Sequence, residues 1–216
     1  MTIRPARPAD ADDLDDICLR TGNDGDDARE RFSDPRLLGA VYVGPYLALE
    51  PDLAFVHDAG DGRAGGYVLG ARDTGEFARA CELHWWPALR TRYPRSAFAP
   101  GTADAEVVTL IHDPPTPDPA VLARYPSHLH IDLLPRWQGA GWGRRLIEHL
   151  LAELAAAGSP GVHLTVSATN ARAIAFYHRT GFVDLVADGG GVTLGRRLGE
   201  AGRGAGGGQL DPRVLG

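Results

Sequence analysis

The stretch Gln138–Arg145, QGAGWGRR, places glycines at 139, 141 and 143 ahead of two arginines. Glycine lets the backbone approach a ligand closely, and successive N–H groups of such a loop can surround an anion. A strand-like segment (127–135, SHLHIDLLP) precedes the glycines, and an amphipathic helical pattern (144–157) follows them. The positive end of that helix would add to the attraction for phosphate. The pattern therefore indicates a phosphate-binding loop, with a tight turn that binds nothing as the alternative.

Two common phosphate-binding loops do not match this stretch. Arg144 stands where the dinucleotide-binding pattern GxGxxG needs its third glycine, and the next strand-like segment (161–167, GVHLTVS) ends without an acidic residue. The nucleotide-binding pattern GxxxxGK[ST] is absent as well. What remains is Gln-x-x-Gly-x-Gly between a strand and a helix.

The segments on either side predict an α/β or α+β domain built around one mixed sheet. Residues 1–198 are expected to form a single domain, and the glycine-rich segment 199–216 a flexible tail. Asp10 is predicted to cap the first helix. Helices are predicted at 11–20, 28–49 with interruptions, 77–94, 120–124, 144–157 and 171–179. Strands are predicted at 2–6, 53–57, 66–71, 105–112, 127–134, 161–167, 183–186 and 192–194.

Composition narrows the function classes. A net charge of -6 over 216 residues argues against a nucleic-acid binder and gives no attraction to an anionic membrane. The first ten residues lack the apolar core of a secretion signal, so we expect a cytoplasmic protein. Cys18 and Cys81 form no metal-binding pattern such as CxxC. They are predicted to be buried reduced thiols, and no metal is expected.

A second motif identifies the ligand of the loop. Residues 170–182 read N-x-x-A-x-x-F-Y-x-x-x-G-F. Together with QxxGxG and the opening IRPARPADADDL (3–14), this segment resembles the Gcn5-related N-acetyltransferase (GNAT) superfamily. The resemblance implies a mostly antiparallel central sheet flanked by helices, a splayed strand pair for the coenzyme A arm, and acetyl-CoA as acyl donor. It implies cofactor binding by Asp132, Leu133, Leu134, Gln138, Gly139, Ala140, Gly141, Trp142, Gly143, Arg144, Asn170, Ala173, Phe176 and Tyr177.

The same resemblance implies direct attack of an amine on the thioester, without an acyl-enzyme. The sequence agrees, because no Gly-x-Ser-x-Gly nucleophile motif occurs. The resemblance places Tyr177 as the acid that protonates the leaving thiolate, and a backbone N–H near Leu134 as the group that polarises the thioester. His128, His130 and Asp132 share one face of a strand. They are candidates for the base, with a hydrogen-bonded core set as the alternative.

The acceptor side is less defined. Asn23 and Asp24 follow the first helix, where the superfamily commonly shapes its acceptor site, and the alternative is a solvated loop. Trp85 is a candidate wall of the acceptor pocket, with core packing as the alternative. The predicted acceptor is a small-molecule or peptide-borne amine, and a homodimer is left open.

A narrower resemblance runs through ICLRTGNDGDD (17–27), the tryptophan-bearing helix and RAIAFYHRTGF (172–182). These segments are similar to the acetyltransferase-like C-terminal domain of O-GlcNAcase. Two functions follow as hypotheses. The first is an acetyl-CoA-dependent N-acetyltransferase, and the second is an acetyl-CoA-binding pseudoenzyme that acts as a sensor or interaction module.

Overall fold

Seven strands form one sheet in the computed structural model, which describes residues 1–116, 118–188 and 190–199. The strand order is β1-β2-β3-β4-β5-β7-β6, and all neighbours are antiparallel except β4 and β5. The mixed, mostly antiparallel sheet that the sequence predicted is thus confirmed. The strands are β1 (Thr2–Pro5), β2 (Ala54–Asp58), β3 (Ala64–Ala71), β4 (Ser127–Leu133), β5 (Gly161–Ser167), β6 (Val183–Asp188) and β7 (Gly191–Arg197).

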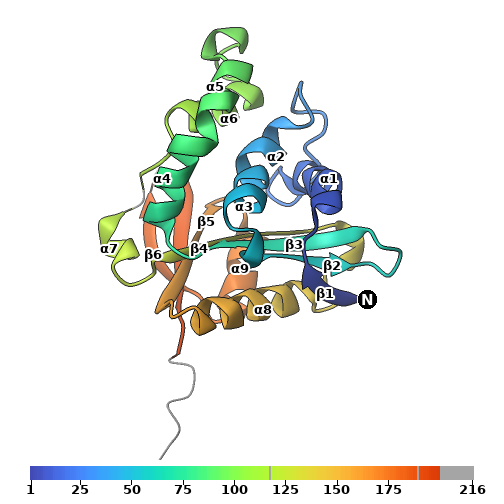
Figure 1. Ribbon diagram of the computed structural model, residues 1–216, viewed down its shortest axis with the longest axis vertical. Coiled ribbons are helices and arrows are strands. Elements are labelled where there is room, and N and C mark those ends of the chain that lie inside the picture. Colours follow the sequence, from blue (N-terminus) through green and yellow to red (C-terminus); the bar gives the residue numbers. More distant parts are fainter. Residues whose placement is uncertain (117, 189, 200–216) are drawn as a thin grey trace, which may run out of the picture.

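Helices cover both faces of the sheet, with α1, α2 and α3 on one face and α8 on the other (Figure 1). Two hydrophobic clusters fill the layers between them. The apolar stripe of α8, from Leu146 to Leu154, is buried against β2, β3 and β4. The helices are α1 (Ala11–Thr21), α2 (Leu37–Tyr42), α3 (Gly44–Leu49), α4 (Thr74–His84), α5 (Trp86–Arg92), α6 (Ala103–His112), α7 (Pro119–Leu122), α8 (Trp142–Ala156) and α9 (Ala171–Arg179). Short 3-10 turns are η1 (Pro8–Asp10), η2 (Pro51–Leu53), η3 (Arg95–Ala97) and η4 (Pro135–Trp137).

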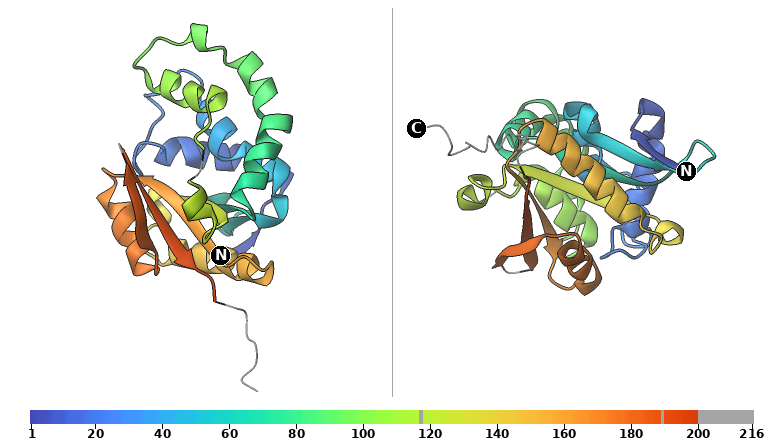
Figure 2. Two further views of the ribbon diagram at one scale, coloured as in Figure 1. Left: turned by 90° about the vertical axis from the view of Figure 1, so that its left-hand side faces the viewer. Right: turned by 90° about the horizontal axis from the view of Figure 1, so that it is seen from below.

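The sheet opens between β4 and β5. These strands pair only at Ser127↔Val162 and His128↔His163, at the start of each strand. Beyond that point β5 continues with β7 and β6 while β4 stays with β3, and the β6–β7 ribbon runs at an angle to the first half of the sheet (Figure 2). The splayed strand pair implied by the family resemblance is present.

The predicted strand at 105–112 is wrong, because this segment belongs to helix α6. A short apolar run does not by itself distinguish a strand from a buried helix. The hydroxyl of Thr102 accepts a hydrogen bond from the N–H of Ala105 and caps the helix. Val107, Val108 and Ile111 then lie on one buried face.

Asp10 occupies the predicted N-cap position of α1, but it does not cap the helix through its side chain. Residues 8–10 form the turn η1, and the Asp10 side chain makes no capping hydrogen bond to α1. Its carboxylate instead accepts two hydrogen bonds from the Arg4 guanidinium, at 2.7 and 2.8 Å, which link β1 to the start of α1. The interrupted helix predicted at 28–49 is confined to α2 and α3, which break at Val43 ahead of Pro45.

Both cysteines are free and buried, as the sequence predicted. No helix in the described ranges combines the length and apolar character that crossing a bilayer requires. The predicted tail at 199–216 lies outside the described residues except for residue 199.

Candidate functional site

The glycine loop ends at the N-terminus of α8. Gly139 and Gly141 have φ angles of 77° and 82°, a left-handed conformation that costs glycine little and other residues more. Gly141 is the N-cap residue, and the helix that follows has 15 residues. The first N–H groups of a helix have no partner within it, so those of Trp142, Gly143 and Arg144 are available to an anion. The backbone therefore fits the pyrophosphate expected at this loop.

A cluster of three aromatic side chains, His57, Trp137 and Trp142, packs at the glycine loop. The sequence did not reveal this cluster. His57 of β2 is 0% exposed, and its ring centroid lies 4.1 Å from that of Trp142 and 4.8 Å from that of Trp137. Burial lowers the pKa of His57, so the ring is neutral. A Cβ atom at Gly65 would lie 2.3 Å from Trp137 Nε1, so only glycine fits opposite this group. His57 looked like an ordinary strand residue because its partners are about 80 positions away in the chain.

Backbone groups of β4 are exposed where the sheet opens. The N–H of Leu134 donates to the carbonyl of Gly65 at 3.1 Å, so this particular N–H is engaged within the sheet. Backbone groups alternate between the two edges of a strand. Those of Ile131 and Leu133 therefore face the gap, because pairing with β5 has ended by then. The Leu133 carbonyl accepts a hydrogen bond from Gln138 Nε2 at 2.8 Å.

Helix α9 forms the other wall of the gap. Asn170 caps this helix, its side-chain oxygen accepting from the N–H of Ala173 at 2.9 Å, which leaves the side-chain NH2 group available. Phe176 packs over Gly143 of α8, where a Cβ atom would come within 3.1 Å of its ring. The predicted residues of both motifs thus meet around one opening.

Tyr177 lies in the core beside that opening. Its ring packs against those of Phe176 and Phe182, at centroid distances of 5.4 and 5.7 Å. Its hydroxyl has no hydrogen-bond partner within the described part of the chain. Burial, and to a smaller extent the charge of Asp132, raises the pKa of Tyr177, so the phenol is protonated at neutral pH.

A polar cluster lies on the helix α1 side of β4. Tyr67 of β3 is fully buried, and its hydroxyl donates to Asp132 Oδ2 at 2.7 Å and lies 3.0 Å from His130 Nε2. His130 Nε2 is 3.2 Å from the same carboxylate oxygen, and both side chains remain partly exposed. The buried thiol of Cys18 approaches the cluster from α1. Tyr67 and Cys18 belong to this cluster but were not found from the sequence, because they come from two other elements.

His128 shares a face of β4 with His130 and Asp132 but does not belong to this cluster. Its Nδ1 lies 2.8 Å from Thr74 Oγ1 and its Nε2 lies 2.8 Å from Tyr46 Oη, so both ring nitrogens are engaged. Burial lowers the pKa of His128 to about 3. A neutral, doubly hydrogen-bonded imidazole is a structural residue, which excludes His128 as the base.

Two predicted polar residues of the loop already have protein partners. Arg144 donates to the carbonyl of Arg179 at 2.8 Å and ties α8 to the end of α9. Gln138 Oε1 accepts from Arg172 Nη2 at 2.5 Å, so the Gln138 side chain connects the end of β4 with α9. Arg172 therefore lies at the mouth of the opening, although its place in the motif did not single it out.

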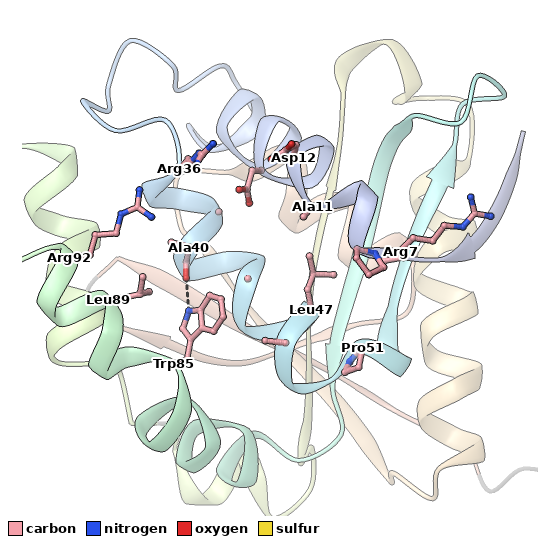
Figure 3. Close-up of a pocket in the computed structure, with 16 residues that line it drawn as sticks. Arg7, Ala11, Asp12, Arg36, Ala40, Leu47, Pro51, Trp85, Leu89 and Arg92 are labelled. Atoms are coloured by element: carbon pink, nitrogen blue, oxygen red, sulfur yellow. Dashed lines mark hydrogen bonds between the residues drawn. The ribbon is translucent and has the colours of Figure 1, made fainter.

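The three residues assigned to the acceptor side are not brought together. Asp24 Oδ2 accepts from Thr169 Oγ1 at 2.7 Å, next to the end of β5, and Asn23 is hydrogen-bonded to Arg31. Trp85 lies elsewhere, in a groove of about 600 Å³ on the outer side of α2 and α3, where its Nε1 donates to the carbonyl of Ala40 (Figure 3). No residue of β4, α8 or α9 lines that groove. Trp85 therefore does not line the opening between β4 and β5.

Comparisons with known proteins agree with this geometry. The family model for the acetyltransferase (GNAT) family matches residues 36–182. The crystal structure of SsHAT is 44% identical with a TM-score of 0.86, covering 92% of this chain and 98% of that one. PH1933 from Pyrococcus horikoshii OT3 is 16% identical with a TM-score of 0.60, covering 91% and 97%. The structure of yncA from Salmonella typhimurium with its cofactor acetyl-CoA is 17% identical with a TM-score of 0.55, covering 95% and 98%. At such low identity the last two bear on the fold alone.

Proposed function

Because this chain belongs to the GNAT acetyltransferase family and so uses acetyl-CoA as its acyl donor, we propose that it acetylates a primary amine with His130 and Asp132 as the proton-accepting pair. Residues 1–198 act as one catalytic domain in this proposal. One observation carries it. The opening between β4 and β5, which begins at the N-terminus of α8, has the His130–Asp132–Tyr67 cluster on the adjoining face of β4.

The proposed donor site follows the opening from loop to cluster. The helix N-terminus and the positive-φ glycines hold the pyrophosphate, and Leu133 and Ile131 offer backbone groups to the pantetheine arm. Leu133 replaces Leu134 as the N–H that polarises the thioester carbonyl. Asn170 contributes its free side-chain NH2 group. Acetyl-CoA supplies the activated acetyl group, and the protein supplies the groups that bind it, polarise its thioester and transfer protons.

Proton transfer is assigned to three side chains. The Tyr67 hydroxyl gives its single proton to Asp132, so the neighbouring His130 Nε2 carries the hydrogen that points toward this pair. That tautomer leaves a lone pair on His130 Nδ1, which accepts the proton of the attacking amine, while Asp132 orients the ring as in a nucleophile–base–orienter set. Tyr177 donates its proton to the leaving thiolate.

The acceptor is a small-molecule or peptide-borne amine that approaches from the side of α1. Asn23 and Asp24 remain candidates to contact it, since they lie next to the end of β5. Trp85 drops out of this role because of its position in the outer groove. The homodimer and the similarity to the O-GlcNAcase domain stay predictions.

Two measurements test this proposal. Calorimetry should show stoichiometric binding of acetyl-CoA, and absence of binding at millimolar ligand would overturn it. A panel of amines incubated with protein and acetyl-CoA should release free thiol with at least one acceptor. Binding without thiol release above background for any amine would instead favour the sensor or interaction module.

A further inference from the structure

We propose that Cys18, His130 and Asp132 form a binding site for a divalent transition-metal ion of the zinc type. One ligand atom from each residue lies within 4.8 Å of the other two. The three come from α1 and β4, more than 100 positions apart in the chain, so no spacing pattern in the sequence signals them. The expectation of no metal rested on local patterns alone.

The separation of the ligand atoms suits tetrahedral coordination. His130 Nε2 and Asp132 Oδ2 are 3.2 Å apart. Two ligands with bonds of about 2.0 Å to a tetrahedral zinc ion are separated by about 3.3 Å. The sulfur of Cys18 now lies within 4.8 Å of both atoms and must come to about 3.5 Å from them, a shift of at most about 1.3 Å.

The donor set selects the class of metal. One sulfur, one nitrogen and one oxygen form a borderline-soft set that zinc accepts, whereas magnesium and calcium require oxygen ligands. On binding, the Cys18 thiol releases its proton to solvent, and the resulting thiolate and carboxylate neutralise the charge of the ion. A neutral site is compatible with the burial of Cys18, which is 2% exposed.

Tyr67 completes the site without being a ligand. Its buried hydroxyl donates to Asp132 at 2.7 Å and fixes the orientation of that carboxylate, as groups around metal ligands commonly do. The His130 and Asp132 side chains are 28% and 20% exposed, so an ion can reach them from solvent. Three protein ligands leave a fourth position for water.

Occupancy of the site has a consequence that rests on the proposed function. Coordination through His130 Nε2 requires the tautomer that carries its proton on Nδ1. The lone pair that accepts the amine proton is then lost, and the metal inhibits acetyl transfer. Metal binding itself does not depend on the catalytic role of these residues.

Cobalt(II) titration of the full chain tests the site, because a cobalt–thiolate bond gives a charge-transfer band in the near ultraviolet. We expect one equivalent of cobalt to produce the band and zinc to remove it. Cys18→Ser should abolish the band, and Cys81→Ser should retain it. Cys81 is the matched control, since it is also a free buried cysteine but belongs to no metal-binding group in the described ranges.

Asp132→Asn and His130→Gln provide a second test if Cys18→Ser folds poorly. Each should weaken zinc binding by at least about tenfold in competition with a chromophoric chelator. No band with excess cobalt, or a band that survives Cys18→Ser, would overturn the metal site. Failure of the proposed catalysis gives a different result. The cobalt–thiolate band would still form, but the protein would release no thiol from acetyl-CoA with any amine.

Discussion

At the residue scale, burial gives Tyr177 two opposing properties. The raised pKa of this phenol keeps it protonated at neutral pH, as an acid must be, but also makes it a weaker acid than free tyrosine, whose pKa is about 10. A thiolate of coenzyme A has to approach the unpartnered hydroxyl before the proton can move. In the proposed mechanism, Tyr177 therefore acts only once the bound substrate has brought the thiolate to its hydroxyl.

Replacing this hydroxyl separates the acid role from packing. Tyr177→Phe should lower kcat by about 100-fold, in the range of one lost general acid, and change the Kd for acetyl-CoA by less than about twofold. Thiol release at saturating substrates and calorimetry measure the two quantities. An unchanged kcat would show that another group, or water, protonates the thiolate.

The two histidines of β4 make a matched pair for the base. His130→Gln should reduce kcat by about 100-fold with little change in melting temperature, because its side chain is partly exposed. His128→Gln should lower the melting temperature, since it disturbs hydrogen bonds to Thr74 and Tyr46, while the folded fraction keeps its kcat. The reverse result, with His128→Gln inactive but stable, would reject the assignment of the base.

At the scale of elements, α8 carries two functions on one helix. Its apolar face anchors it beneath the sheet, and its N-terminus presents free N–H groups at the opening between β4 and β5. The aromatic group of His57, Trp137 and Trp142 holds the loop against β2. The position of the proposed anion site is therefore set by packing on both sides of the loop.

The two ends of α8 allow a controlled test of this anion site. Gly141→Glu places a carboxylate at the loop and should weaken acetyl-CoA binding on the order of 100-fold, or about 2.7 kcal/mol. Gly158→Glu is the control, because Gly158 follows the other end of α8 with a similar φ of 85° and no neighbour within 4 Å. Both variants carry similar backbone strain, so calorimetry that shows equal losses for the two would argue against an anion site at Gly141.

At the scale of the whole molecule, the ionised carboxylate of Asp15, in the groove that Trp85 also lines, lowers the free energy of unfolding. Asp15 on α1 lines that groove without a hydrogen bond or ion pair to any described residue, and burial raises its pKa from 3.8 to about 6. The unfolded chain ionises this carboxyl near pH 4 and the folded protein near pH 6. The contribution of Asp15 to the free energy of unfolding therefore declines as pH rises through this window, and the loss persists above it.

Asp15→Asn should remove that loss. After allowance for the partial exposure of the side chain, we expect a gain of about 1 kcal/mol in the free energy of unfolding at pH 7 and little gain at pH 4. Urea unfolding at the two pH values measures the difference. A gain of equal size at both pH values would mean that packing rather than ionisation is responsible.

Sequence patterns predicted the elements that carry their own local signals. The amphipathic stripe of α8, the helix at 171–179 and the alternation of β4 are each encoded within a few residues, and the structure confirms them. The apolar run of α6 was misread because its helical cap at Thr102 is a weaker signal than its β-branched residues. The N-cap position of Asp10 was predicted, but the partner of its side chain was missed because Arg4 is on another element.

The sequence by itself determined that the sheet is mixed and that acetyl-CoA is the donor, because these follow from patterns and motifs within short segments. Only the tertiary structure decided which polar side chains work together. It engaged both ring nitrogens of His128 with Thr74 and Tyr46 and placed His130 beside Asp132, Tyr67 and Cys18. It also separated Trp85 from the opening. The physical reason is that strand alternation assigns a face to each residue, while the environment of that face comes from β3 and α1, which are distant in the chain.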